Sequence, residues 1–353
     1  MVVSGGSSLD PITHALASLT LARAGGNHLP RYGTAMLLTT GVAADLDALS
    51  YFGGPAVFLR FHRTVLHSLV GSLSIAFVTT AIFLAIDKIR SKRQPVSQTP
   101  VRPGFGVGLV ALVCVIGAGS HILLDLVSGI GVRLLWPFRA GWNGWELLTN
   151  IDLWILTLLA AAILLPELLK LVSDEIGEQR KSSRGRGAAI TALVFLVLYI
   201  GSRTAFHSQA VDLLASREYH GRPPVAVAAF PFSATPFTWR GVVTTDATVE
   251  ELPVSLLGGS EFDPDRTLTR YKAEPSAALD AGLRSSEANT FLAYAKIPFA
   301  SIIRMENGYR FELRDMRFSL DDPSPENILA RADFNSSLQL LREELRYASS
   351  NGR

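Results

Sequence analysis

Histidine and aspartate residues recur within or beside the apolar segments of this 353-residue sequence. They are His14, Asp45, Asp47, His62, His67, His121 and Asp125. Ionisable side chains are costly in a membrane segment, so each is a candidate functional residue. A set that mixes imidazoles with carboxylates suits Zn²⁺, Mn²⁺ or Fe²⁺ better than Ca²⁺ or Cu⁺. We predict that these side chains bind one or two divalent ions, with zinc as the favoured metal.

The spacing of these residues indicates how they could share an ion. His121 and Asp125, in the stretch SHILLD, are four residues apart and so lie on one helix face. His62 and His67 are five apart, which suits one helical face poorly, so His62 should reach in from a loop. Asp45 and Asp47 would point to different sides of a helix. One could bind an ion directly, while the other bridges a second ion or holds a histidine ring.

Two residues are candidates for catalysis rather than for metal binding alone. Asp47 is the candidate bridging ligand or general base. Arg63 has two interpretations that the sequence leaves open: its guanidinium could anchor the chain at the membrane surface, or it could clamp an anionic oxygen beside the ions. His28, His207 and His220 have no carboxylate at ligand spacing and are expected to be ordinary loop or surface residues.

Bulk composition indicates the kind of protein that must position these residues. The sequence is 48% hydrophobic and 18% charged, with a mean hydropathy of +0.27. Soluble domains carry about 25% charged residues, so this balance indicates a membrane protein. A net charge of +2 is too small to indicate a nucleic-acid partner, and we expect none. The single cysteine, Cys114, excludes an internal disulfide and a cysteine-based zinc site. The N-terminus has no basic region typical of a cleavable signal peptide.

Apolar runs predict a polytopic α-helical membrane protein with about five transmembrane helices. A span needs roughly 20 apolar residues. The strong candidates are 65–86, 104–127, 151–171 and 188–206, and the weaker one is 33–52, which carries two aspartates near its end. Residues 10–24 predict a short N-terminal helix, because Asp10 and Pro11 form a strong helix start.

Basic residues in the loops predict the orientation. Loops rich in Lys and Arg at 88–102 and 180–186 should face the cytoplasm. The segment 128–150 carries three tryptophans and should face out. All seven candidate ligands then lie towards the outer membrane face. We divide the chain into a transmembrane metal-site domain, 1–206, and a soluble α+β domain, 207–353, outside the cytoplasm.

The α+β prediction for the tail depends on its own sequence patterns. The stretches FTWRGVVTTDATVEEL and GYRFELRDMRFSL are typical of strands separated by turns. Residues 275–293 predict a helix.

Four motifs resemble those of a known family. DPITHALASL, ADLDAL, FHRTVLHSL and SHILLDL match in order and spacing the bacterial inner-membrane proteins called membrane-bound metal-dependent hydrolases, one of which is LexA-regulated. The resemblance covers about residues 9–170, and LLWPF and TPFTWRGVV resemble a long form of the family. More distantly, the order of residues is similar to zinc-dependent phospholipase C and the P1-type nucleases. That similarity implies metal ligation by His14, Asp45, His62, His121 and Asp125.

The combined expectation is a membrane-bound metal-dependent hydrolase in the bacterial inner membrane. Metal-activated water would attack a phosphoester in a lipid or lipid-linked substrate, and Arg63 would stabilise the charge that develops on phosphate. The alternative is a metal or solute transporter, because intramembrane His and Asp also mark ion pathways. Transporter sites usually lie near the bilayer midplane between repeated helices, whereas these ligands lie at helix ends. A purely structural zinc site needs four ligands, fewer than the seven candidates here.

Overall fold

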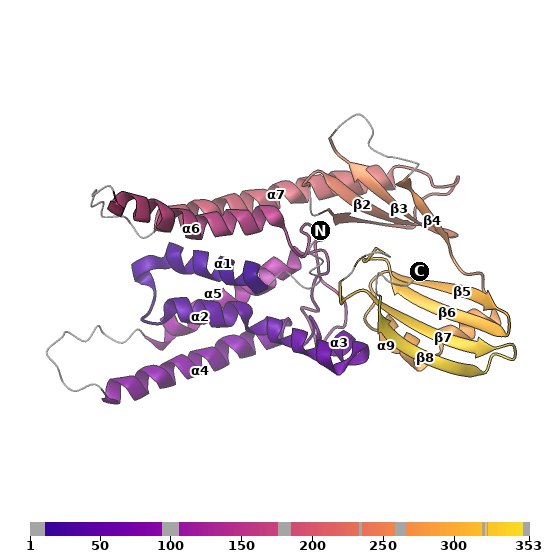
Figure 1. Cartoon of the computed structure of the whole chain (residues 1–353), viewed down its shortest axis with the longest axis horizontal. Coiled ribbons are helices and arrows are strands. Elements are labelled where there is room, and N and C mark those ends of the chain that lie inside the picture. The colour runs from indigo at the N-terminus through magenta and orange to yellow at the C-terminus, as the bar shows by residue number, and fades with distance from the viewer. Residues whose placement is uncertain are drawn as a thin grey trace.

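The computed structural model describes residues 11–93, 106–175, 185–232, 235–257, 266–319, 322 and 324–348, without the side chains of 91–93 and 173–175. Helices occupy one end of the molecule and two β-sheets occupy the other (Figure 1). The predicted helix-start residue Asp10 lies outside the described residues, as do the basic residues Arg102, Arg180, Lys181 and Arg184.

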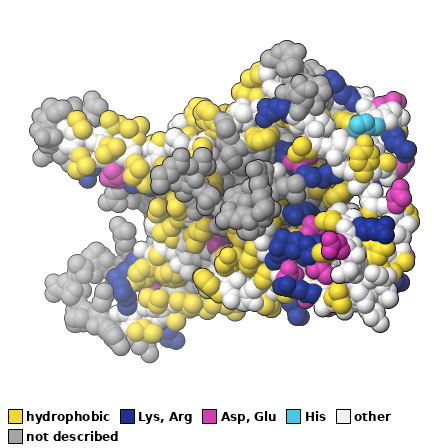
Figure 2. Space-filling model, turned by 45° about the vertical axis from the view of Figure 1, so that its right-hand side comes forward, with side chains coloured by type: hydrophobic (Ala, Val, Ile, Leu, Met, Phe, Trp, Pro, Cys, Tyr) yellow, Lys and Arg dark blue, Asp and Glu magenta, His cyan; other side chains and the backbone are white. Residues whose placement is uncertain are grey.

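Four helices among the described residues are long and apolar enough to cross a membrane. They are α4 (Leu69–Arg93), α5 (Val107–Leu126), α6 (Leu153–Glu175) and α7 (Arg186–Ala215). They correspond to the four strong spans predicted from hydropathy. Their outer faces expose large apolar side chains such as Phe77, Leu168 and Phe195, as expected for contact with lipid. Figure 2 shows hydrophobic side chains spread over the helices, while charged side chains gather over the sheets.

The weaker predicted span, 33–52, is divided between two elements. An α-helix, α2 (Gly33–Val42), is followed by a 3₁₀ segment, η2 (Ala43–Gly53), and neither is long enough to cross a bilayer. The change of helix type matters for Asp45 and Asp47. In a 3₁₀-helix, with three residues per turn, positions two apart are about 120° apart around the axis. Both aspartates can therefore be buried on the inner side, as observed.

Two further α-helices, α1 (Pro11–Gly25) and α3 (Pro55–Phe61), and a short 3₁₀ turn, η1 (Gly26–His28), lie before α4 in the described part of the chain. Helix α1 corresponds to the predicted N-terminal helix and packs against α2, α6 and α7. Helix α3 follows Gly54, whose φ of 88° suits glycine and lets the chain turn into Pro55 at the first helical position. Phe58 and Leu59 of α3 are buried within the hydrophobic core of the second sheet.

The C-terminal part consists of two four-stranded antiparallel sheets. The first has the order β1-β2-β3-β4 and the second β5-β6-β7-β8. The strands are β1 (Ala226–Pro231), β2 (Thr238–Thr244), β3 (Thr248–Ser255), β4 (Leu268–Tyr271), β5 (Pro298–Met305), β6 (Gly308–Asp315), β7 (Ile328–Asn335) and β8 (Leu340–Tyr347). The helix predicted at 275–293 is divided into α8 (Ala277–Leu283) and α9 (Ser286–Leu292). Ser285 lies between them and caps α9, because its hydroxyl accepts a hydrogen bond from the backbone N–H of Ala288.

Helix α7 joins the helices to the first sheet. Its 30 residues make a rod of about 45 Å, longer than the roughly 30 Å hydrocarbon core of a bilayer. Ala210 and Leu214, near its end, pack in one core with Trp239, Val243 and Val254 of the sheet. The last turns of α7 therefore belong to the same packed unit as the first sheet, beyond the boundary predicted at residue 206.

Candidate metal centre

The helical part brings the predicted site residues together at the end nearest the sheets. His14 comes from the first turn of α1, and Asp45 and Asp47 come from η2. His62, Arg63 and His67 lie in the segment between α3 and α4. His121 and Asp125 lie in the last two turns of α5. All eight side chains, Arg63 included, are buried.

Four ligand-type atoms surround one point. His67 Nε2 and His121 Nε2 lie 3.2 and 3.1 Å from Asp125 Oδ2, and each lies 3.8 Å from Asp45 Oδ1. Ligands at about 2.1 Å from a tetrahedral ion are about 3.4 Å from one another. The four separations fall on either side of that value. The arrangement therefore matches the size of a zinc-like ion.

The contacts of Nδ1 in His67 and His121 determine that Nε2 of each ring faces this point. His121 Nδ1 lies 2.9 Å from the carbonyl oxygen of Gly41, so it must carry the proton that this carbonyl accepts. In the neutral ring, Nε2 then has a lone pair facing a carboxylate oxygen of Asp125. His67 Nδ1 lies 2.8 Å from Asp47 Oδ2, which directs His67 Nε2 in the same way. Two facing lone pairs repel each other unless a cation lies between them.

His14 adds a further ligand-type side chain on the other side of Asp125. Its Nε2 is 3.7 Å from Asp125 Oδ1, and its ring stacks on His121 with centroids 3.9 Å apart. One atom each from His14, His121 and Asp125 lies within 4.8 Å of the others. Asp125 thus faces two groups of possible ligands with its two oxygens.

Many polar atoms of the cluster lack a hydrogen-bond partner among the residues that the structure describes. They are both ring nitrogens of His14, Nε2 of His67 and of His121, Asp45 Oδ2 and both carboxylate oxygens of Asp125, whereas His67 Nδ1 has Asp47 Oδ2 at 2.8 Å. Buried polar atoms in folded proteins are almost always satisfied. This concentration of buried, unsatisfied nitrogens and oxygens is what a metal site looks like without its ion, so the residues present fit a divalent cation.

Arg63 lies against the same cluster in an unusual backbone conformation. Its φ of 54° is in the left-handed region, which is costly for a residue with a side chain. The backbone N–H of Arg63 donates to Asp47 Oδ2 at 2.8 Å, and its Nη1 is 3.2 Å from Asp125 Oδ1. Nη1 also donates to Ser128 and Gly131, but Nε and Nη2 have no partner among the described residues. The side chain is fully buried, which argues against a membrane-surface anchor.

Asp47 and His62 lie one layer further from the central point. Asp47 Oδ1 lies 3.0 Å from His62 Nδ1, and Oδ2 faces His67 and the backbone of Arg63. Burial by itself would raise the pKa of the Asp47 carboxyl, but the neighbouring His67 and His62 outweigh that effect and hold its pKa below the usual range. The structure thus places Asp47 between the rings of His62 and His67, the arrangement expected if Asp47 is the aspartate that holds a histidine ring.

Sequence reasoning missed one residue of this layer. Glu326, from the turn before β7, lies 3.2 Å from Nε2 of His62 and is buried. Both ring nitrogens of His62 therefore face carboxylates. Glu326 stands in DDPSPENI, a polar and turn-rich stretch that carries no signal of burial.

The comparison with protein families agrees with the membrane interpretation. A family model described as "YdjM inner membrane protein" matches residues 9–210, more than half of the chain. The chain belongs to the YdjM inner membrane protein family. All the candidate site residues identified in the sequence fall inside the matched region, whereas both sheets and Glu326 fall outside it. No curated protein and no solved structure matches the chain. Hydrolase activity and LexA control stay predictions.

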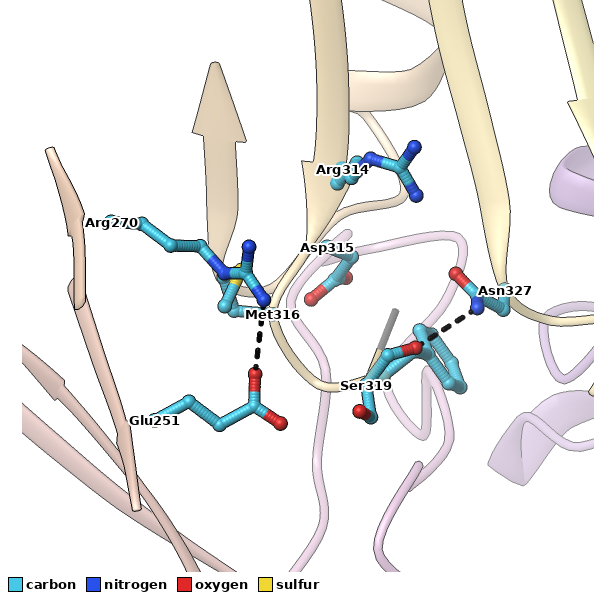
Figure 3. Close-up of a pocket in the computed structure, with 8 residues that line it drawn as sticks. Glu251, Arg270, Arg314, Asp315, Met316, Ser319 and Asn327 are labelled. Atoms are coloured by element: carbon cyan, nitrogen blue, oxygen red, sulfur yellow. Dashed lines mark hydrogen bonds and ion pairs between the residues drawn. The ribbon is translucent and has the colours of Figure 1, made fainter. Parts of the chain in front are cut away.

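A small pocket elsewhere has a different character. It lies between the two sheets and is lined by Glu251, Arg270, Arg314 and Asn327 among others (Figure 3). Arg270 Nη2 is 3.7 Å from Glu251 Oε2, and Asn327 donates to the carbonyl of Ser319 at 3.1 Å. The pocket contains none of the seven predicted ligands, and its charges face partners within the domain.

Proposed function

We propose that this protein is a membrane-bound metal-dependent hydrolase that cleaves a phosphoester in a lipid or lipid-linked substrate. The observation that supports this most is the position of the buried Arg63 guanidinium against the imidazole and carboxylate atoms of the cluster. Among the described residues, Nε and Nη2 of Arg63 and most of those atoms have no hydrogen-bond partner. Hydrolysis of a phosphoester needs a metal ion that activates water and, beside it, a positively charged group that binds the phosphate oxygens.

His67, His121, Asp45 and Asp125 would hold a divalent ion, and His14 would extend the site towards a second one. Zinc suits this ligand set, and manganese or iron are alternatives. When bound, such an ion supplies Lewis-acid activation of a water molecule. The roles of Asp47 and His62 differ from those predicted as direct ligands. We assign Asp47 to orient His67 and Arg63, because both of its oxygens already face those groups and His62.

The remaining chemistry is assigned to groups of this chain. Nε and Nη2 of Arg63 would donate to the non-bridging oxygens of phosphate, where negative charge increases in the transition state. Asp45 Oδ2 is buried without a hydrogen-bond partner in the described structure, and it would accept the proton that the attacking water loses. Asp45 lies on the 3₁₀ segment η2 and Arg63 in the turn with positive φ, and both side chains are buried rather than mobile at the surface.

The surroundings of the cluster favour a substrate with lipid tails. Phe52 and Phe138 are 84% and 82% exposed, on the 3₁₀ segment and in the segment after α5. Trp145, in the segment that follows α5, and Trp154, in the first turn of α6, are also exposed. Aromatic side chains of this kind are typical of membrane–water interfaces. A site at interface depth could act on a headgroup while its tails stay in the bilayer.

The test is hydrolysis by the purified full-length protein in lipid vesicles that contain phosphoester lipids. Zn²⁺- or Mn²⁺-loaded wild-type protein should release the phosphorylated headgroup or phosphate, and His121→Ala should not. His220→Ala, which changes an exposed histidine away from the cluster, is the matched control and should keep full activity. Metal uptake into the vesicles, with no hydrolysis of any phosphoester, would replace the hydrolase with the transporter.

A further inference from the structure

His62 connects the candidate metal centre to the C-terminal sheets. Its Nδ1 lies 3.0 Å from Asp47 Oδ1, and its Nε2 lies 3.2 Å from Glu326 Oε1. The three side chains are at most 3% exposed. A ring held between two buried carboxylates has its orientation determined from both sides.

The line of contacts continues from His62 into the cluster. Asp47 uses its second oxygen, Oδ2, to contact His67 Nδ1 at 2.8 Å. His67 then presents Nε2 to Asp45 and Asp125. A displacement of Glu326 would therefore change the position of a ring that we assign as a metal ligand, through two intermediate side chains.

Glu326 is itself held firmly. The next residue, Asn327, is buried, and its amide donates to the carbonyl oxygens of Ser319 and Asp322 at 3.1 and 2.8 Å. The Asn327 carbonyl accepts the N–H of Ala348 at 2.7 Å, beside the end of β8. These bonds tie the turn that carries Glu326 to the second sheet.

His62 is held to the same sheet by a second, apolar attachment. Phe58, one turn earlier in the chain, stacks on the His62 ring with centroids 4.3 Å apart. Phe58 is buried in one core with Phe291, Phe311 and Phe334 of the C-terminal domain. Both the ring and the carboxylate that it faces are thus positioned by the second sheet.

We propose that Glu326 is a positioning residue of the metal centre, which orients His67 through His62 and Asp47. The C-terminal domain, outside the region that matches the family, thereby completes the centre. The proposal rests on the metal site of the proposed function, but not on phosphoester chemistry. Residues that orient a metal ligand directly change affinity by about 10- to 100-fold, so a residue acting through two others should change it by about three- to tenfold.

The test uses the full-length protein and two metals as probes. Zn²⁺ affinity is measured by competition with a chelator, and the visible spectrum of the Co²⁺-loaded protein reports the ligand geometry. Glu326→Gln, nearly the same in shape, should weaken Zn²⁺ binding about three- to tenfold and change the Co²⁺ spectrum. The matched control is Glu250→Gln, because Glu250 is also a buried glutamate of the C-terminal domain that faces a histidine, His220, at 3.4 Å. It should alter neither reading.

A double variant separates positioning from general support of the fold. If Glu326 acts through His62, then Glu326→Gln should have no further effect on affinity or spectrum in a His62→Gln background. Additive losses in the double variant would overturn the proposal. Should Glu326→Gln fail to fold, Glu326→Asp withdraws the same charge by one methylene and should shift both readings in the same direction.

The outcomes distinguish this proposal from the proposed function. Unchanged affinity and spectrum in Glu326→Gln would overturn the positioning role and leave the hydrolase standing. Metal-loaded wild-type protein that cleaves no phosphoester would overturn the hydrolase and leave Glu326 in its role. Wild-type protein that binds neither Zn²⁺ nor Co²⁺ would overturn both.

Discussion

Two buried clusters of charged side chains lie where the helices meet the sheets, and they use their polar atoms differently. In the candidate metal centre, the oxygens of Asp125 and the facing ring nitrogens have no hydrogen-bond partner in the described chain. In the second cluster, Asp315 accepts hydrogen bonds on both oxygens, from the backbone of Lys296 and Ile297 and from Arg317. Arg317 in turn donates to the carbonyls of Ile130 and Tyr294 at 3.2 and 3.4 Å.

The difference separates a structural role from a binding role. Asp315 and Arg317 are 3% and 4% exposed, within the range of the residues of the metal centre. Burial alone therefore does not identify a site. A network whose donors and acceptors are all satisfied needs no ligand and serves to fix the packing. Unsatisfied acceptors that face one another require a cation, so the two clusters should respond in opposite ways to substitution.

The largest effect should come from removing a ligand of the metal centre. Structural zinc sites bind with about 10–16 kcal/mol from four ligands, or about 2.5–4 kcal/mol per ligand, so the loss of one ligand should weaken binding roughly a hundred- to a thousandfold. Purified wild-type protein should contain one or two equivalents of a first-row divalent ion, and His121→Ala and Asp125→Ala should each lose most of it. Elemental analysis of the detergent-purified proteins measures this. Full metal retention in both variants would contradict the assignment.

Breaking the satisfied cluster should reduce stability and leave the metal in place. Arg317→Met removes the cation and leaves the Asp315 carboxylate buried, which should cost about 3 kcal/mol in the free energy of unfolding. Denaturant unfolding followed by tryptophan fluorescence provides the measurement, with elemental analysis of the folded fraction beside it. A variant of normal stability that has lost its metal would reverse the roles of the two clusters.

Arg63→Lys tests whether the buried guanidinium serves an anion rather than the fold. Lysine keeps the charge but loses the planar fork, so turnover of a phosphoester should fall about tenfold while metal content stays normal. Arg203→Lys is the control, since Arg203 is also a buried arginine but lies over the ring of Trp239 at 4.0 Å, in α7. It should lower stability without a matching loss of turnover. Equal turnover in Arg63→Lys and wild-type protein would remove Arg63 from the chemistry.

The smallest effect on stability is expected from an ion pair at the surface of the second sheet. Arg310 donates to both oxygens of Asp333 at 2.7 and 3.1 Å, and the Arg310 hydrogen bond holds the pKa of Asp333 below its usual value. Asp333→Asn should cost less than about 1 kcal/mol, because both side chains are still partly exposed and water screens the pair.

The pH dependence of this small effect has a defined sign. Because the pKa of Asp333 is lowered in the folded state, its contribution is fully present above the ordinary aspartate pKa and is lost as the pH falls through the folded value. Unfolding curves of wild type and Asp333→Asn at several pH values should therefore converge in acid. A difference that grows towards low pH would contradict this account.

Hydropathy and residue types in the sequence predict most of the helical part and the residues that meet at its end. Long apolar runs gave the positions of α4 to α7, because twenty apolar residues in sequence have few alternatives to a membrane helix. The four-residue spacing of His121 and Asp125 gave their shared face. The structure of the segment 33–52 was harder to predict, since its composition does not distinguish an α-helix from the 3₁₀ turn that buries both aspartates.

Other features depend on contacts that no local pattern encodes. Whether an aspartate faces the ion or a histidine ring depends on distances of about one ångström, and so the position of Asp47 between two rings emerges only in three dimensions. The contact between Glu326 and His62 joins residues 264 positions apart. Burial distinguishes between a surface anchor and an anion-binding group for Arg63, and that burial depends on its contacts with Ser128, Gly131 and Asp125.

The insertion of Phe58 and Leu59 into the core of the second sheet has a consequence for biogenesis. The ribosome makes α3 early, whereas the strands that bury these two side chains are among the last to be synthesised. During the interval α3 can pack against η2, where Tyr51 lies beside Phe58, but the rest of its apolar face lacks these strands and must be sheltered by lipid or a chaperone. Truncation before β5 would remove these strands permanently, so a shortened chain should be degraded even though α4 to α7 are complete.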